Sequence, residues 1–431
     1  MFRKVLETIG TRYIVALLNL ALIFINARVL GVQGVGQVGL ILAAVTMIIS
    51  INSVLCGNTI VYFMSKYPVR LVLLPAYLWT PISSAVGCLL LFALGLLPEG
   101  YSFDVFWLSV LNSYVSANSR FLLGKDQVKG FNLTFLIQGG LLFFLLLYFY
   151  YICKEQTIQA YLWGMYLANG LALFVSALLL IPHLKRPEEK SAEKPFIPLV
   201  REMFAYGLWS SADSLAEVYT TRLNYFLVRS FSGLGAVGLL DAGTKISESV
   251  WHISRSVSFI TYSEVSRQQE ESARKQITLR LFKFTLLAVS FITLAIIFIP
   301  EWIYTDYLFT SEFAGMRLVI LLLAPGILAF ACNNVLGHYF IGSGRIRYSA
   351  FCSFTGLAVL IFIGYFLIPA YGIIGSAITS SIAFLSMLAF STILFSRITS
   401  TRFREFLPGK QDFRFLAERV SKRDSHRVQK K

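Results

Sequence analysis

Residues 34–40 read GVGQVGL, and residues 233–239 in the other half of the chain read GLGAVGL. Both stretches contain the G-x-G-x-x-G run of a dinucleotide-binding loop, which requires an acidic residue about 20 positions further on. The first run lacks that residue, because no Asp or Glu occurs between Glu7 and Glu99. A heptapeptide that recurs in the second half of a chain indicates a duplicated structural unit rather than two nucleotide sites.

The repeat predicts what its glycines do. The matched glycines, taken as Gly34, Gly36 and Gly39 against Gly233, Gly235 and Gly238, are expected to form tight turns and to allow two helices to approach closely. A second echo supports the duplication, since LLGKDQVKG at 122–130 parallels FIGSGRIRY at 340–348. The two halves are therefore expected to repeat the same fold.

The composition indicates a membrane protein. Hydrophobic residues make up 56% of the 431 residues and charged residues 14%, whereas a soluble domain carries about 25% charged residues. Five cysteines are scattered without a C-x-x-C pair, so neither a disulfide framework nor a metal site is expected. The net charge of +15 comes from short loops and a tail between apolar segments, which argues against a nucleic-acid partner. No cofactor is expected.

The apolar segments predict an all-α integral membrane protein with twelve transmembrane helices, because a bilayer core requires about 20 apolar residues per helix. The predicted spans lie near 11–30, 37–64, 71–97, 103–123, 131–152, 160–181, 204–229, 237–264, 279–300, 316–341, 349–368 and 373–396. They form two six-helix lobes, residues 1–181 and 204–396, which are parallel repeats around a central cavity. A linker at 182–203 joins the lobes. A basic tail follows at 397–431, where Phe413, Leu416 and Val420 fit either an amphipathic helix on anionic lipid or a solvated segment.

The distribution of Lys and Arg predicts the orientation. Most of the 38 basic residues fall in the loops on one side, whereas the opposite loops, LPEGYSFD at 97–104 and PEWIYTDYLFTSEF at 300–313, are acidic. By the positive-inside rule both termini and the linker are cytoplasmic, and the glycine repeats face outward. We expect a multi-pass protein of the bacterial inner membrane.

The seventh and eighth predicted spans contain charged residues at helical spacing. Asp241, Lys245, Glu248, His252 and Arg255 form one stripe on span eight, and span seven carries Asp213 and Glu217 with Arg222 and Arg229 beside them. A charged residue at the bilayer centre costs about 2.5–3.5 kcal/mol, so these side chains must line a hydrated cavity or pair with one another. By depth, Asp213 is expected near Arg255, and Arg222 and Lys245 are expected within reach of Asp241.

The first lobe offers mostly uncharged polar groups at the matching depth. Its residues there are Asn19, Asn26, Arg28, Asn52 and Asn58. Amides suit hydroxyl-rich ligands and the cations of the second lobe suit phosphate, which favours an amphiphilic substrate with a sugar part and an anionic part. Asparagine also bridges helices structurally, so this interpretation has a simpler alternative.

NARVLGVQGVGQVGL at 26–40 and LIPAYGIIGSAITSSI at 367–382, in two parallel six-helix lobes, resemble the polysaccharide-transport branch of the multidrug/oligosaccharidyl-lipid/polysaccharide (MOP) exporters. The likeness is to the O-antigen (Wzx-type) flippases. Family members often have proline and an aromatic residue where this chain has Val32 and Val35. The related lipid II flippases typically have two further helices, for which this chain has no room.

The resemblance implies that an undecaprenyl-pyrophosphate-linked oligosaccharide, such as an O-antigen or capsule repeat unit, is moved from the inner to the outer leaflet by alternating access. Cations lining the cavity hold the pyrophosphate in that family, and the residues here that match this role are Lys245, Arg255, Arg222 and Arg28. Asp213, Glu217, Asp241, Glu248 and His252 then couple ions or pair with those cations. The implied partners are the lipid-linked substrate, membrane lipids and polysaccharide polymerase or glycosyltransferase machinery, and the protein is expected to be a monomer.

Two other readings stay open at this point. A MATE-like multidrug/cation antiporter shares the two-lobe architecture, but it favours an acidic cavity, whereas the carboxylates here are matched by cations. A membrane enzyme requires a catalytic constellation, and neither His252 nor His338 is part of one. The chain is therefore not expected to be an enzyme. Electrostatics favours the membrane potential as the driving force, since a potential negative inside drives a bound anion outward.

Overall fold

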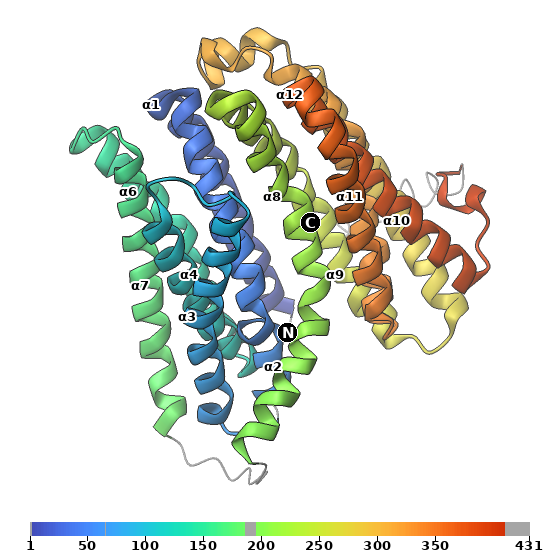
Figure 1. The fold of residues 1–431 in the computed structure, drawn as a ribbon. Coiled ribbons are helices and arrows are strands. Elements are labelled where there is room, and N and C mark those ends of the chain that lie inside the picture. Colours follow the sequence, from blue (N-terminus) through green and yellow to red (C-terminus); the bar gives the residue numbers. More distant parts are fainter. Residues whose placement is uncertain (1, 65, 186–194, 410–431) are drawn as a thin grey trace, which may run out of the picture.

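The computed structural model describes residues 2–64, 66–185 and 195–409, and within these ranges all regular structure is helical (Figure 1). The first half contains α1 (Phe2–Cys56), α2 (Asn58–Met64), α3 (Val69–Ala93), α4 (Ser102–Gly124), α5 (Val128–Leu136), η1 (Ile137–Leu141), α6 (Leu142–Leu147), η2 (Tyr148–Ile152) and α7 (Ile158–Lys185). The second half contains α8 (Phe196–Ser249), α9 (Trp251–Arg267), α10 (Glu271–Ile297), η3 (Ile303–Leu308), η4 (Ser311–Phe313), α11 (Met316–Gly342), α12 (Ile346–Thr399) and η5 (Phe403–Phe406).

Three long helices are each two membrane spans joined at a glycine. Gly31 in α1 (φ 66°), Gly233 in α8 (φ 79°) and Gly372 in α12 (φ 57°) have non-helical backbone angles that favour glycine. In the described part of the chain, eight helices are long and apolar enough to cross a membrane. With the three breaks, with α4, and with the second part of α8 continuing into α9, the twelve predicted spans are accounted for.

The two halves lie side by side, with α8 running between them (Figure 1). Their equivalence is visible in the turn after α4 and the turn after α11. The residue in the left-handed conformation is Asp126 (φ 58°) in the turn after α4 and Gly344 (φ 78°) in the turn after α11. The next N–H closes the helix end, from Gln127 to Leu122 O at 2.8 Å and from Arg345 to Phe340 O at 2.7 Å. The second sequence echo therefore marks a real structural repeat.

The glycine repeat is also real, but its predicted register and its predicted turns are wrong. Gly34, Gly36, Gly39, Gly235 and Gly238 are helical, and of the matched glycines only Gly233 forms a turn. The structural partner of Gly233 is Gly31, three residues before Gly34. Matching glycine to glycine in the sequence pairs Gly34 with Gly233. In the fold the equivalent residues are those at which the two helices break, Gly31 and Gly233.

In the corrected register Gly36 corresponds to Gly238, and these two glycines contact each other across the halves. A Cβ at residue 36 would overlap the carbonyl oxygen of Leu234, and a Cβ at residue 238 would overlap that of Val32. Val32 and Leu234 are themselves equivalent, so the contact is symmetric about an axis between the halves. The predicted close approach of helices is confirmed, because glycines let two backbones touch.

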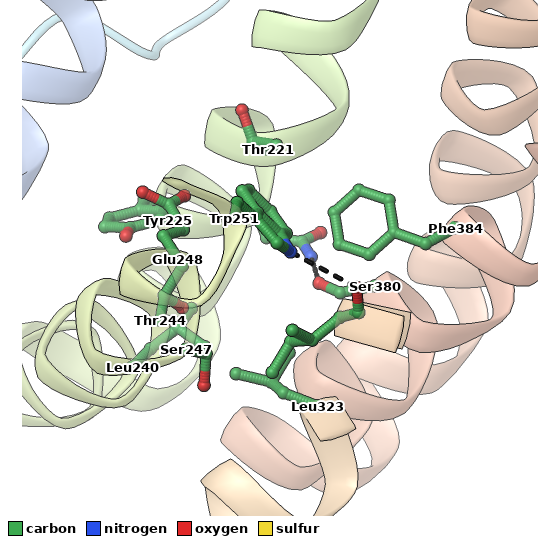
Figure 2. A pocket seen from close by; sticks show the side chains of 12 residues that line it. Thr221, Tyr225, Leu240, Thr244, Ser247, Glu248, Trp251, Leu323, Ser380 and Phe384 are labelled. Carbon is green, nitrogen blue, oxygen red and sulfur yellow. Dashed lines mark hydrogen bonds between the residues drawn. The ribbon is translucent and has the colours of Figure 1, made fainter. Parts of the chain in front are cut away.

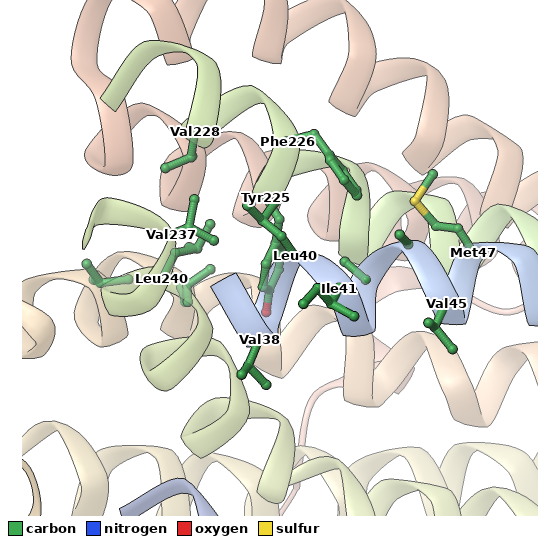
Figure 3. Packing of buried hydrophobic residues seen from close by; sticks show 14 of the residues in the cluster. Val38, Leu40, Ile41, Val45, Met47, Tyr225, Phe226, Val228, Val237 and Leu240 are labelled. Carbon is green, nitrogen blue, oxygen red and sulfur yellow. The ribbon is translucent and has the colours of Figure 1, made fainter. Parts of the chain in front are cut away.

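The same register places Gly39 opposite Asp241. A Cβ at residue 39 would lie 3.0 Å from Cγ of Asp241, so the missing side chain makes room for a buried carboxylate. Around this contact, apolar side chains of α1 interlock with those of α8 (Figure 3). Leu40 and Ile41 from α1 and Phe226 and Val237 from α8 are all buried in one cluster.

The connections define two ends of the helical bundle, named here by their charge. The basic end holds the turns at 66–69, 124–128, 267–271 and 342–346, and the acidic end holds Glu99, Glu301, Asp306 and Glu312 in the loops at 94–101 and 298–315. The predicted linker 182–203 is mostly helical where it is described, since α7 extends to Lys185 and α8 begins at Phe196. Beyond Thr399 the chain turns back so that Phe406 packs on Phe282 and Phe395. The proposed amphipathic segment around Phe413 lies outside the described residues.

Candidate functional site

The predicted charged stripe belongs to two helices. Asp241, Lys245 and Glu248 lie in α8, and His252 and Arg255 lie in α9. Between them the helix tightens locally, because Val250 N–H donates to Ser247 O and Ile253 N–H donates to Val250 O, each at 3.2 Å. The stripe therefore changes character there: its first part is enclosed, whereas His252 and Arg255 are exposed.

The enclosed part consists of closed ion pairs. Lys245 Nζ lies 2.7 Å from Asp241 Oδ2, one helical turn away. Arg222 holds both carboxylate oxygens of Glu248, each at 3.1 Å. A cation that is already paired in this way has little left to offer an anion. Both Lys245 and Arg222 lie within reach of Asp241, as expected, but only Lys245 pairs with it, and the ion-pair partner of Arg222 is Glu248.

The remaining carboxylates of the two spans have different partners from those expected. Asp213 accepts hydrogen bonds from Ser349 Oγ (2.7 Å) and Ser353 Oγ (2.5 Å), both on α12. The expected pairing of Asp213 with Arg255 is thus wrong. Arg255 instead lies 4.0 Å from Glu217. The prediction failed because depth along a helix does not give the direction in which a side chain points.

Two of the predicted cations lie at the acidic end, close to loops of the opposite half. Arg28 donates to the carbonyl oxygen of Tyr307 in the loop 298–315. Arg229 lies 3.4 Å from Glu99, whose side chain is 90% exposed. Arg28 was predicted to hold pyrophosphate, but its guanidinium is engaged with a backbone carbonyl at the far end from Arg255.

Three arginines gather towards the basic end. Arg12 on α1 stacks over the ring of Phe259 on α9 at 5.6 Å, and it lies within electrostatic reach of both Arg255 and Arg120. Arg120 on α4 donates to Asn58 Oδ1 at 3.1 Å. Among the residues whose side chains are described (10–64, 66–184 and 195–409), no carboxylate lies within 4 Å of Arg12 or Arg120. Among these residues, Arg255 has only Glu217 at 4.0 Å, so the three cations together carry more positive than negative charge, which favours an anion.

This arginine cluster (Arg12, Arg120 and Arg255) was only partly predicted. Arg12 and Arg120 stand at the edges of the predicted spans 11–30 and 103–123, so a linear pattern groups them with the basic residues of the loops. One available signal is that Arg12 and Asn19 stand two helical turns apart on α1 and so share one face of that helix. Both are exposed in the fold, and so are His252, Arg255 and Phe259 on one face of α9. The inter-half faces of α1 and α9 are thus accessible near the basic end.

At the acidic end the halves are closed. Besides the Gly36–Gly238 contact, Val32 N–H donates to Glu312 Oε2 at 2.8 Å, so that a carboxylate from the second half caps the helix that begins after Gly31. Phe24 on α1 meets Phe309 edge-on, with ring centroids 5.2 Å apart. The halves therefore meet at the acidic end, whereas the faces of α1 and α9 are accessible near the basic end, where the first part of α8 still packs on the first half through Tyr206 and Tyr62.

A small cavity lies inside the second half, between α8, α9, α11 and α12 (Figure 2). Its lining includes Asn224, Ser247, Glu248 and Trp251, and Asn224 Nδ2 donates to Ser380 Oγ at 2.6 Å. Its volume of about 20 Å³ is room for roughly one water molecule. The cavity is too small for a lipid-linked sugar and is separate from the arginine cluster.

Solved structures share this architecture. An inward-facing multidrug resistance MATE family transporter of the MOP superfamily superposes with a TM-score of 0.72, covering 90% of this chain and 94% of that one at 14% identity. The chain shares the fold of this MOP superfamily transporter. The resemblance predicted from the sequence, and the fold of twelve helices in two lobes, are both confirmed.

Other members of this fold match less closely. The lipid II flippase MurJ in an inward closed conformation gives a TM-score of 0.63, covering 94% of this chain and 89% of MurJ at 14% identity. An outward-facing MATE family transporter gives 0.57, with 92% and 94% covered at 14% identity.

Sequence comparisons cover parts of this MOP fold. Residues 158–317, from α7 to the start of α11, match the family model described as polysaccharide biosynthesis protein. An uncharacterized membrane protein of Methanocaldococcus jannaschii is 21% identical over 209 residues, which are 48% of this chain. The match spans 41% of that archaeal protein's length.

Proposed function

We propose that this MOP-fold protein moves an undecaprenyl-pyrophosphate-linked oligosaccharide, such as an O-antigen or capsule repeat unit, from the inner to the outer leaflet. The observation that carries the proposal is the arginine cluster, which combines three cations from both halves on the accessible inter-half face. Guanidinium groups suit diphosphate because their planar forks bind its oxygens in pairs. A lipid diphosphate would bridge the halves at this cluster.

The proposed binding site differs from the one expected from the sequence. Arg255 keeps its predicted role, and Arg12 and Arg120 replace Lys245, Arg222 and Arg28. Lys245 and Arg222 serve instead as counter-charges that allow Asp241 and Glu248 to be buried, since a buried carboxylate requires a partner. Arg28 holds the acidic-end loop.

The match to a polysaccharide biosynthesis family model and the likeness to a lipid II flippase support this substrate class. In the proposed cycle, the conformation described here faces the cytoplasm, with its basic end inward, and takes up the lipid diphosphate near Arg12 and Arg255. The halves then close at the basic end and part at the acidic end. We place the protein in the bacterial inner membrane with both termini cytoplasmic.

Binding of a short polyprenyl diphosphate tests the proposal. Geranylgeranyl diphosphate is titrated onto the protein in nanodiscs, and Arg12→Ala and Arg255→Ala are each expected to weaken binding at least tenfold, because a charge-assisted contact contributes about 1.5–3 kcal/mol. Arg267→Ala is the matched control, since Arg267 is an exposed arginine of α9 that pairs with Glu264.

The rival function is a MATE-like multidrug antiporter, because a MATE family transporter shares this fold with a TM-score of 0.72. If the lipid diphosphate fails to bind, or binds equally well without Arg12 and Arg255, the flippase proposal is wrong. Ethidium efflux that depends on this protein would then favour the antiporter. A cluster of three cations is a poor site for a cationic drug, so we expect no such efflux.

A further inference from the structure

We infer that Glu217 is a positioning residue of the diphosphate site, which holds Arg255 in the empty protein and is displaced from it by the substrate. The inference rests on the proposed function. Glu217 lies on α8 and faces Arg255 on α9 across 4.0 Å. Among the described residues, no other carboxylate of the two charged spans lies within 4 Å of an arginine of the cluster.

Comparison of the four carboxylates singles out Glu217. Asp213 has both oxygens occupied by serine hydroxyls, Asp241 is buried against Lys245, and Glu248 is held at both oxygens by Arg222. Each of these three is fixed by contacts of 3.1 Å or less. Glu217 has a partner only at the edge of ion-pair distance, and that partner, Arg255, is 53% exposed.

A loose, partly exposed ion pair is suited to exchange. Exposed pairs contribute about 0–1 kcal/mol, so an incoming phosphate that contacts Arg255 at hydrogen-bond distance outcompetes a carboxylate 4.0 Å away. While the diphosphate is bound, Glu217 continues to compete with it for Arg255. The residue therefore keeps Arg255 oriented before binding and favours release afterwards, so that its removal tightens binding instead of weakening it.

The sign of this effect makes it testable. Geranylgeranyl diphosphate is titrated onto wild-type protein and Glu217→Gln in nanodiscs, and dissociation rates are measured by dilution. Glu217→Gln is expected to bind about fivefold more tightly, mainly through slower dissociation, because it removes a competing charge of up to about 1 kcal/mol. Glu264→Gln is the matched control, since Glu264 forms a similarly exposed pair with Arg267 at 3.8 Å.

The double variant Glu217→Gln/Arg255→Ala isolates the pair, and its affinity should equal that of Arg255→Ala alone. Unchanged or weaker binding by a folded Glu217→Gln would overturn the inference, while the proposed function stands if Arg12→Ala and Arg255→Ala still lose affinity. If the wild-type protein does not bind the probe, the proposed function itself fails. Should Glu217→Gln not fold, Glu217→Asp decides, because its shorter carboxylate releases Arg255 and should give a smaller gain in affinity.

Discussion

At residue 238 the chain has room for a hydrogen atom and nothing larger. The helix that begins after Gly233 meets the helix that begins after Gly31 at this point, backbone against backbone, and the carbonyl of Val32 occupies the place of a Cβ. Three residues earlier, Gly235 has its nearest neighbour, Val32 Cγ1, 3.7 Å from an ideal Cβ, which is ordinary contact. Position 238 therefore excludes any side chain, whereas position 235 has room for a methyl group.

Gly238→Ala is expected to destabilise the closed acidic end by about 1–3 kcal/mol, as overpacking does. Gly235→Ala should be neutral or stabilising by up to about 1 kcal/mol, because alanine is the better helix former. Thermal unfolding of both variants in detergent checks this. Equal stability of the two would show that the Gly36–Gly238 contact does not restrict side chains.

At the level of elements, the loop 298–315, which contains η3 and η4, contributes to the closure of the acidic end. It is braced internally, since Glu301 Oε1 accepts from Gly315 N–H at 2.5 Å and Tyr304 OH donates to Ile296 O at 3.0 Å. From this base Glu312 reaches the first N–H of the helix after Gly31. A carboxylate at a helix start is stabilised by the free N–H groups and by the helix dipole. Opening at this end must break that cap.

Glu312→Ala should raise the ratio of open to closed acidic ends about fivefold, because a helix cap contributes about 1 kcal/mol. Spin labels at residues 152 and 371, both exposed at this end, report the separation of the halves by pulsed electron resonance after the native cysteines are replaced. Asp306→Ala is the matched control, since Asp306 contacts only Thr305 of its own loop among the described residues. Identical distance distributions in the two variants would refute the role of the cap.

For the whole molecule, orientation in the membrane decides which leaflet the arginine cluster faces. Native Cys153 is exposed at the acidic end, between η2 and α7. In right-side-out vesicles a membrane-impermeant maleimide should label wild-type protein from outside, and Cys153→Ser should remove this label. Gln269→Cys in the Cys153→Ser background, at the basic end, should react only after permeabilisation. The reverse pattern would place the cluster in the outer leaflet and contradict the proposed direction of uptake.

The membrane spans were predictable because hydropathy depends only on position along the chain. The partners of the charged residues were not, because they depend on how each helix is rotated. Asp213 and Arg255 lie at similar depth, yet Asp213 faces Ser349 and Ser353 on α12. Arg12 and Arg120 appeared to be loop residues, since nothing in a linear pattern brings α1, α4 and α9 together. Lys245 and Asp241, one turn apart on one helix, form the pair that local spacing did predict.

The position shared by Gly39 and Asp241 also bears on how such a molecule can arise. Two identical six-helix chains related by a two-fold axis would carry the same residue at both places. With aspartate at both, each carboxylate would meet a side chain where it now meets a hydrogen atom, and with glycine at both, Lys245 would lose its counter-ion. The present arrangement requires the two positions to differ. A fused gene, whose halves mutate separately, can therefore encode this arrangement, whereas a homodimer cannot.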